Sequence, residues 1–261
     1  MEDKILLEKD GALGWIVFNR PEKRNALNLA MWKTIPDYIN ELNFDTNIRV
    51  ILFRGAGNEA FVAGADISEF EELRGNVESG KMYNETTENA FRAIRNSAKP
   101  VIAMIRGFCI GGGCAIALNC DLRIAADDAT FATPPAKLGL SYGYENVQQV
   151  INVIGAAYAK EMLYTARTYH ADEALRIGLI HQKVYVDELR EYTNKYARNI
   201  AQNAPLSISA VKIAINEHLK SPDNRDLVKI DNAMNLCFDS EDYKEGYTAF
   251  LEKRKPAFKG K

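Results

Sequence analysis

Three consecutive glycines, at positions 111–113, limit the folds open to this chain more than any other part of the sequence. They follow an apolar run, residues 101–105, and open a segment of small residues that ends at Asp121. Glycine lacks a Cβ atom, and a helix start leaves backbone N–H groups unpaired, so the pattern predicts a strand, a turn and a helix start that can bind an oxyanion. A tight turn with close helix packing explains the glycines equally well. The segment is neither a Walker P-loop nor a dinucleotide fingerprint.

Short apolar runs rich in β-branched residues alternate with helical patterns through the first two thirds of the chain. These predicted strands are residues 14–18, 49–53, 100–105, 121–125 and 180–186. A helix is predicted over residues 28–42, although Pro36 lies inside it and is expected to bend or divide it. After about residue 186 the remaining signals are helical. The sequence therefore predicts an α/β fold followed by a helical C-terminal third.

Composition excludes several classes of function. The formal net charge is −2 over 261 residues, which leaves no positive excess for binding nucleic acid or an anionic membrane. No apolar run approaches the roughly 20 residues that cross a bilayer, and no export signal is visible, so we expect a cytoplasmic protein with neither partner. The four cysteines lack metal-ligand spacing and three lie in the small-residue segment, so we expect buried thiols, no metal site and no redox chemistry.

A second glycine-terminated strand supplies another candidate backbone donor. Residues 50–55 and 101–107 both run from an apolar strand into Arg-Gly, which is a weak internal repeat. The first of them leads to the small-residue turn at residues 61–67, where the Ala65 N–H is free to point at a carbonyl oxygen. Two converging backbone donors make an oxyanion hole. An ordinary loop, with Asp66 capping a helix, is the alternative.

Several motifs together resemble one known family. They are Asn19-Arg-Pro-Glu-Lys-Arg-Asn-Ala-Leu27, Phe61-Val-Ala-Gly-Ala-Asp-Ile67, Gly111-Gly-Gly-Cys114 and Cys120-Asp121, and they are similar in kind and order to those of the crotonase (enoyl-CoA hydratase/isomerase) superfamily. The resemblance covers nearly the whole chain. It implies a spiral of ββα units that binds an acyl-CoA over residues 1–195, and a helical trimerisation region over residues 196–261.

The resemblance also implies roles for individual residues. Ala65 and Gly112 would donate their N–H groups to the thioester oxygen as it becomes an enolate. The residues implied to line the coenzyme A pocket are Arg24, Ala26, Leu27, Ala63, Gly64, Asp66, Ile67 and Gly111. Coenzyme A would enter only as part of the substrate, with no other cofactor and no metal. The implied partners are an acyl-CoA and further copies of this chain, as a homotrimer or a dimer of trimers.

The sequence departs from the hydratases of this family at two positions. Those enzymes carry one glutamate two residues after the triple glycine and another four residues after a phenylalanine. The matching positions here are Ala115 and Pro135. Adding water to an enoyl-CoA needs groups that activate the water and deliver a proton, and each contributes about 10²- to 10⁴-fold. The usual hydratase mechanism is therefore unsupported.

Replacement groups are expected in the loop after Gly139. Glu145 is the best candidate base, and we expect Tyr142, Tyr144 and apolar neighbours to raise its pKa by desolvation. A solvated or helix-capping Glu145 is an equal alternative. Decarboxylating relatives carry a tyrosine at the place of Tyr142. Glu85 and Glu88 lie on a predicted helix that borders the acyl pocket in relatives, and surface solvation is the favoured interpretation for both.

Three hypotheses for function remain open. The first is an enoyl-CoA hydratase/isomerase family enzyme, an acyl-CoA lyase or isomerase in which Glu145 and Tyr142 move protons. The second is a malonyl-type acyl-CoA decarboxylase, which needs the oxyanion hole and a proton donor such as Tyr142 but no base. The third is a catalytically silent acyl-CoA-binding protein.

Overall fold

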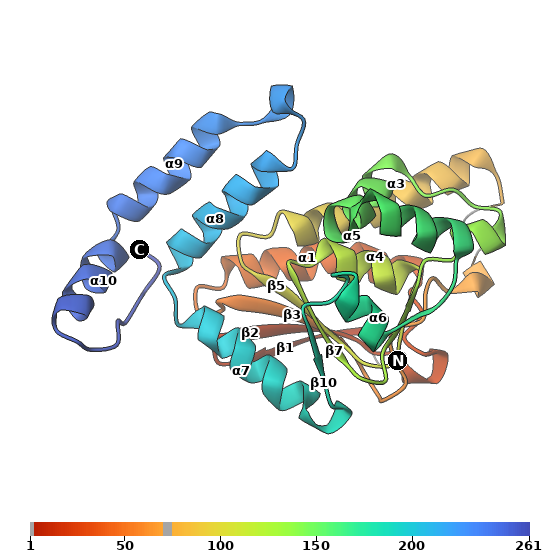
Figure 1. The fold of residues 1–261 in the computed structure, drawn as a ribbon, viewed down its shortest axis with the longest axis horizontal. Coiled ribbons are helices and arrows are strands. Elements are labelled where there is room, and N and C mark those ends of the chain that lie inside the picture. The colour runs from red at the N-terminus through yellow and green to blue at the C-terminus, as the bar shows by residue number, and fades with distance from the viewer. Residues whose placement is uncertain (1–2, 70–74) are drawn as a thin grey trace.

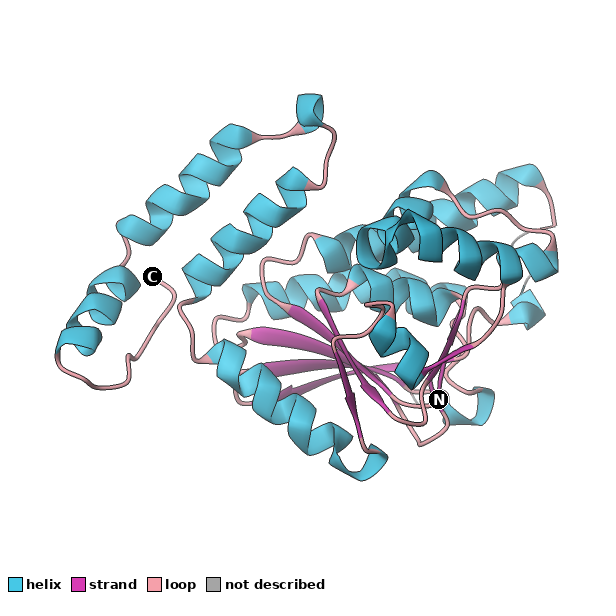
Figure 2. Ribbon diagram, viewed as in Figure 1, coloured by secondary structure: helices cyan, strands magenta, loops and turns pink. Residues whose placement is uncertain are grey.

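The computed structural model describes residues 3–69 and 75–261, and within them ten strands form two sheets. The larger sheet lies at the centre of the body and its strands are parallel except for the first pair (Figures 1 and 2). In spatial order it contains β1 (Ile5–Asp10), β2 (Leu13–Phe18), β3 (Val50–Gly55), β5 (Val101–Ile105), β7 (Leu122–Ala126) and β10 (Gln182–Val184). The smaller sheet contains β4 (Ala60–Val62), β6 (Phe108–Ile110), β8 (Thr130–Ala132) and β9 (Tyr169–His170).

The chain repeats one unit as it winds through both sheets. A strand in the larger sheet is followed by a short strand in the smaller sheet and then by a helix. The helices that follow in this way are α3 (Val77–Arg95), α4 (Gly112–Asn119) and α5 (Tyr144–Thr165). The predicted α/β class is confirmed. The predicted strands at 14–18, 49–53, 100–105, 121–125 and 180–186 match β2, β3, β5, β7 and β10 within a few residues.

Two apolar cores lie on opposite faces of the larger sheet, because the side chains of a strand alternate between its faces. Ile16 and Phe18 of β2 pack with α1 (Leu29–Phe44), α3 and α4 on one face. Trp15 and Val17 pack on the other face against α7 (Leu189–Ala201). Such strands are buried on both faces, so they appear in the sequence as continuous apolar runs.

Helix α1 begins where the sequence predicts and continues through its proline. The Asn28 side chain caps it by accepting a hydrogen bond from the Met31 N–H. Pro36 lies within the helix, and Ile35 and Ile39 beside it are buried. The proline therefore does not divide the helix.

The last helices form an arm that extends from the body (Figure 1). The short α6 (Ala171–Arg176) and α7 belong to the body, whereas α8 (Pro205–His218), α9 (Leu227–Phe238) and α10 (Glu241–Leu251) make the arm. Lys212 of α8 connects the arm to the body, because it forms an ion pair of 2.7 Å with Asp121. The predicted division at residue 195 falls inside α7 and stays a prediction.

Buried thiols agree with the sequence prediction. Cys109, Cys114 and Cys120 are free and buried. Across residues 3–69 and 75–261, no cluster of three metal-binding side chains occurs. Among those same residues, no helix is both long enough and apolar enough to cross a membrane.

Candidate active site

Parallel pairing of β4 and β6 brings two loops to the same edge of the smaller sheet. Ala60 pairs with Phe108 and Val62 pairs with Cys109. The chain leaves β4 toward residues 63–67 and leaves β6 toward the three glycines. The two loops that follow the glycine-terminated strands β3 and β5 in the sequence therefore lie side by side.

The backbone N–H of Ala65 has no hydrogen-bond partner among the described residues. The groups on either side of it, the Gly64 carbonyl and the Asp66 N–H, bond to Leu27 instead. Leu27 donates its N–H to the Gly64 carbonyl at 2.9 Å, and Asp66 donates its N–H to the Leu27 carbonyl at 2.8 Å. These two bonds form a parallel β-bridge between Leu27 and Ala65. In this arrangement the Ala65 N–H lies between the two bonded groups and points away from Leu27.

The N–H of Gly112 is also unpaired within the part of the chain that the structure describes. Gly112 is the first residue of α4, where an N–H has no partner inside the helix. Gly111 before it has φ of 53° and donates its own N–H to the Ala132 carbonyl at 2.8 Å. A Cβ atom at Gly111 would lie 3.9 Å from the Cα of Gly64, so the two loops nearly touch.

The Arg24–Leu27 segment is held against the β4 loop by backbone bonds and a buried ion pair. Ala63 donates its N–H to the Arg24 carbonyl at 3.0 Å. The side chains of Arg20 and Asp66 form an ion pair of 2.8 Å and are 8 % and 9 % exposed. Partial burial opposes ionisation of Asp66, but hydrogen bonds from Ser68 and Arg20 outweigh it and lower the pKa of this carboxyl.

A hollow of about 190 Å³ lies beside Arg24, between this segment and the turn before β4. The Arg24 guanidinium lies 5.1 Å from the centre of the Phe108 ring and forms an ion pair of 3.1 Å with Glu59. Ile67 is 67 % exposed. Of the residues expected to line the coenzyme A pocket, Arg24 lines this hollow, and the role of the others stays a prediction. The Asp66 carboxylate is already engaged by Arg20, Lys23 and Ser68.

Tyr142 is half-buried and packs against the core that contains α4. Desolvation raises the pKa of its phenol, and the nearby thiols of Cys114 and Cys109 add to the effect. The phenol is therefore neutral at physiological pH. Its hydroxyl makes no hydrogen bond to any residue within 3–69 or 75–261, which leaves its proton available to a ligand.

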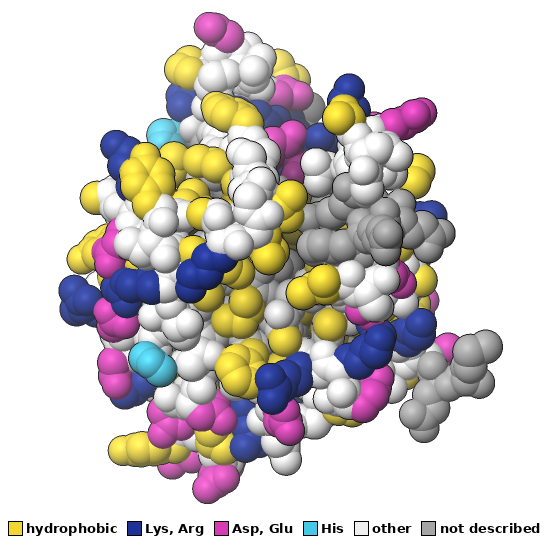
Figure 3. Space-filling model, turned by 90° about the vertical axis from the view of Figure 1, so that its right-hand side faces the viewer, with side chains coloured by type: hydrophobic (Ala, Val, Ile, Leu, Met, Phe, Trp, Pro, Cys, Tyr) yellow, Lys and Arg dark blue, Asp and Glu magenta, His cyan; other side chains and the backbone are white. Residues whose placement is uncertain are grey.

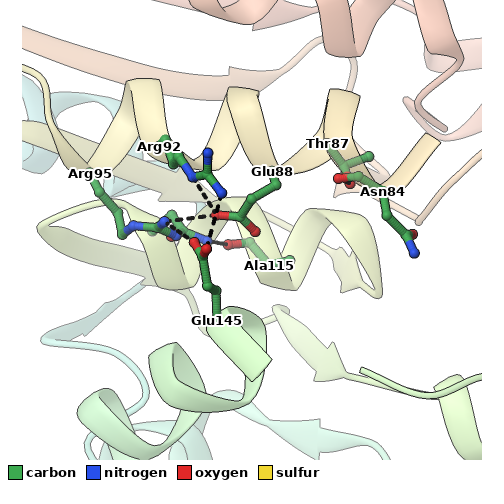
Figure 4. Close-up of polar contacts among 8 residues, drawn as sticks. Asn84, Thr87, Glu88, Arg92, Arg95, Ala115 and Glu145 are labelled. Atoms are coloured by element: carbon green, nitrogen blue, oxygen red, sulfur yellow. Dashed lines mark hydrogen bonds and ion pairs between the residues drawn. The ribbon is translucent and has the colours of Figure 1, made fainter. Parts of the chain in front are cut away.

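Glu145 is held as an ion pair, and the prediction that its pKa is raised is wrong. Its carboxylate accepts hydrogen bonds of 3.0 Å from Arg92 and from Arg95 (Figure 4). A hydrogen bond with the adjacent Glu88 carboxyl, together with Arg92 and Arg95, lowers the pKa of Glu145 to about 2. Tyr144, expected to wall this carboxylate, is 81 % exposed.

The pKa of Glu88 shifts in the opposite direction, which the sequence did not lead us to predict. Its side chain is 15 % exposed and lies 2.8 Å from Arg95, whereas Glu85 on the same helix is exposed as expected. Desolvation and the neighbouring Glu145 raise the pKa of Glu88. The signal was present in the spacing, because Glu88, Arg92 and Arg95 fall on one face of a helix. We call Glu88, Arg92, Arg95 and Glu145 the charged cluster.

The charged cluster connects to the helix that carries Ala115. Arg95 donates to the Asn119 side chain at 2.6 Å, and Asn119 donates to the Ala115 carbonyl at 2.8 Å (Figure 4). Ala115 is 6 % exposed, and Pro135 begins a short 3₁₀ helix. Neither position supplies a carboxylate, but hydrogen bonds through Arg95 and Asn119 connect the carboxylates of the charged cluster to the Ala115 carbonyl.

The end of the molecule opposite the arm has an apolar centre with charged surroundings. Figure 3 shows apolar side chains gathered in the middle of this face, with basic and acidic side chains interspersed around them.

Comparisons with known proteins match one family over nearly the whole chain. The family model described as enoyl-CoA hydratase/isomerase matches residues 8–261. The short-chain-enoyl-CoA hydratase of Clostridium acetobutylicum is 38 % identical over 97 % of this chain and 96 % of its own length. The methylmalonyl-CoA decarboxylase of Escherichia coli is 33 % identical over 94 % of each chain.

Solved structures agree in fold as well as in sequence. The crystal structure of an enoyl-CoA hydratase/carnithine racemase from Magnetospirillum magneticum superposes with a TM-score of 0.94 and 36 % identity, over 100 % of this chain and 97 % of that one. The chain therefore belongs to the enoyl-CoA hydratase/isomerase family and has the crotonase fold.

Proposed function

We propose that this protein binds an acyl-CoA thioester and stabilises its enolate with the N–H groups of Ala65 and Gly112. The observation that carries the proposal is that neither N–H group has a partner among the described residues, on loops that nearly touch at Gly64 and Gly111. Two preorganised donors stabilise an oxyanion in a site of low dielectric, and losing one typically costs about 10²- to 10³-fold in rate. Membership of an acyl-CoA family supports the substrate class.

For the reaction, we propose decarboxylation of a malonyl-type acyl-CoA. The bond between the α-carbon and the carboxylate breaks, CO₂ leaves, and the electron pair moves into the thioester enolate. The neutral phenol of Tyr142 then gives its proton to the α-carbon and recovers one from solvent. The locked ion pair of Glu145 supports this choice, since decarboxylation needs a proton donor and no base.

Hydration or isomerisation is the second candidate, and the charged cluster is the observation in its favour. Two neighbouring carboxyls whose pKa values are pushed apart can act as an acid and a base. Here Glu88 would supply the acid and Glu145 the base, in place of the groups absent at Ala115 and Pro135. Relatives with hydratase names agree with this candidate.

A panel assay separates the candidates. The protein is incubated with crotonyl-CoA, a 3-enoyl-CoA and methylmalonyl-CoA, and products are identified by mass. The variants are Tyr142→Phe, Glu88→Gln and Glu145→Gln, with exposed Glu85→Gln as the matched control. For the decarboxylase, CO₂ loss falls about 10²-fold or more in Tyr142→Phe and is unchanged in Glu88→Gln.

Other outcomes of the panel point elsewhere. Turnover of an enoyl-CoA that collapses in Glu88→Gln or Glu145→Gln but not in Glu85→Gln would replace the decarboxylase by a hydratase or isomerase. Tight binding of all three thioesters without turnover would leave the acyl-CoA-binding protein.

We further propose that copies of this chain associate through the arm. Large apolar side chains are exposed along it, namely Val211, Ile215, Leu219, Leu227, Val228, Met234, Leu236, Phe238, Tyr243, Tyr247, Phe250 and Leu251. Exposed apolar surface of this extent marks an interaction face. A trimer or a dimer of trimers is the proposed assembly, and a cytoplasmic location stays a prediction.

A further inference from the structure

A second hollow lies where the ends of β3 and β5 meet the start of α7. Its volume is about 190 Å³. Arg54 of β3, Arg106 after β5 and Arg190 of α7 line it, together with Gly57, Asn58 and apolar side chains. The apolar lining residues Met104 and Leu189 belong to the core on the α7 face of the larger sheet. Ala65 packs against the other core, so the proposed enolate site lies on the opposite face.

Two of the three guanidinium groups are held by carboxylates. Arg54 donates to both carboxylate oxygens of Glu8, at 3.0 and 3.1 Å. Arg106 lies 3.3 Å from Asp128 and donates to the Asn58 side-chain oxygen at 2.9 Å. These contacts fix both arginines at the wall of the hollow.

Arg190 has no hydrogen bond or ion pair with any residue that the structure describes. Its guanidinium carbon lies 3.9 Å from the centre of the Trp15 ring, in a cation–π contact. That contact leaves the N–H donors of the guanidinium without a partner among the described residues. Arginine in this state is suited to planar, bidentate recognition of an oxyanion.

The surroundings of Arg190 make a bound anion favourable. Arg190 is exposed on one side, and partial desolvation lowers its pKa. The positive charge of Arg54 lowers it further, against opposing contributions from Glu8 and Asp10. Arg190 also lies in the first turn of α7, where the helix macrodipole repels a cation and attracts an anion.

We propose that this hollow binds a phosphate-type oxyanion between Arg190, Arg54 and Arg106. The proposal does not rest on the function proposed above. The hollow adjoins the one beside Arg24, because the two share Asn58 and Ala60. Phosphate groups occur both in free phosphates and in coenzyme A, so either could supply the anion. We assign the site to a free phosphate, and the experiment distinguishes the two sources.

Calorimetric titration of the full-length protein with inorganic pyrophosphate tests the proposal. We expect saturable binding that weakens about tenfold or more in Arg190→Gln, since a charge-assisted contact is lost. Lys195→Gln is the matched control, because Lys195 is an exposed cation on the same helix that does not line the hollow. If Arg190→Gln fails to fold, Arg106→Gln serves as the second variant with the same expected loss.

Saturating coenzyme A separates the sources of phosphate. With a free-phosphate site, pyrophosphate still binds in its presence, and Arg190→Gln binds coenzyme A as tightly as the unchanged protein. Three results would overturn the proposal: no saturable binding of pyrophosphate, equal weakening in Lys195→Gln, or loss of pyrophosphate binding when coenzyme A is present.

Discussion

A single methyl group at position 112 tests the backbone-donor geometry. A Cβ atom there would lie 3.0 Å from Cζ2 of the buried Trp32, closer than nearly all real Cβ contacts. Either the ring or the start of α4 must move, and a shifted N–H no longer points at the oxyanion. We expect Gly112→Ala to lower kcat/KM about 10²-fold or more, measured on whichever substrate the panel identifies. Unchanged turnover with a folded variant would remove Gly112 from the enolate site.

The charged cluster has a predictable effect on acid stability. The pKa of Glu145 is lowered to about 2 in the folded protein, below its ordinary value near 4.5. A lowered carboxyl pKa stabilises the fold above the unfolded value, and this contribution is lost as pH falls from about 4.5 toward 2. Glu145→Gln is therefore expected to be destabilised at pH 7 and to approach the unchanged protein only near pH 2.

Urea denaturation of both proteins at the two pH values measures this difference. Glu85→Gln, which removes an exposed carboxylate from α3, should follow the unchanged protein throughout. A stability gap between Glu145→Gln and the unchanged protein that does not depend on pH would contradict the ion pairing of Glu145.

A buried ion pair joins two segments of the chain near the candidate active site. Arg20 and Asp66 connect the segment before α1 to the loop after β4, and both are more than nine-tenths buried. Removing one partner leaves the other charge buried, which typically costs about 3–5 kcal/mol. We expect Asp66→Asn to lose stability of that order in chemical denaturation. Lys23→Gln removes the 48 %-exposed partner of the same carboxylate and should cost at most about 1 kcal/mol.

All strands of the larger sheet except β1 could be predicted from sequence, and those of the smaller sheet could not. Strands buried on both faces form apolar runs of five or six residues, as in β2 and β5. By contrast, β4, β6 and β8 have three residues each, too few to establish an alternation. The antiparallel β1 was also missed, because its outer residues are exposed.

The candidate site divides in the same way. Ala65 and Gly112 could be nominated from sequence because small side chains leave the backbone N–H accessible, and their role as donors stays a prediction. The state of Glu145 was missed because it depends on Arg92 and Arg95, which lie 53 and 50 positions earlier in the chain. Charged side chains that come together only when α3 and α5 are placed in the folded protein produce no pattern among neighbouring residues of the sequence.

At the scale of the whole molecule, the arm predicts self-association. A monomer has a mass of 29.2 kDa, so a trimer has a mass of about 88 kDa and a dimer of trimers twice that. Light scattering coupled to size exclusion should give one of the two larger masses at micromolar concentration. Phe250→Glu, which places a charge on an 82 %-exposed apolar position of α10, should shift the distribution toward the monomer. A monomeric unchanged protein would contradict association through the arm.

Arg95 connects the charged cluster to the arm. Its guanidinium contacts Glu88 and Glu145, while its backbone carbonyl accepts a hydrogen bond of 3.0 Å from Asn216 of the arm. We expect association through the arm, where it displaces α8, to act on a residue that lowers the pKa of both carboxyls. Coupling between sites is reciprocal, so proton uptake by the cluster is then expected to change the free energy of association by the same amount that association changes the affinity for that proton.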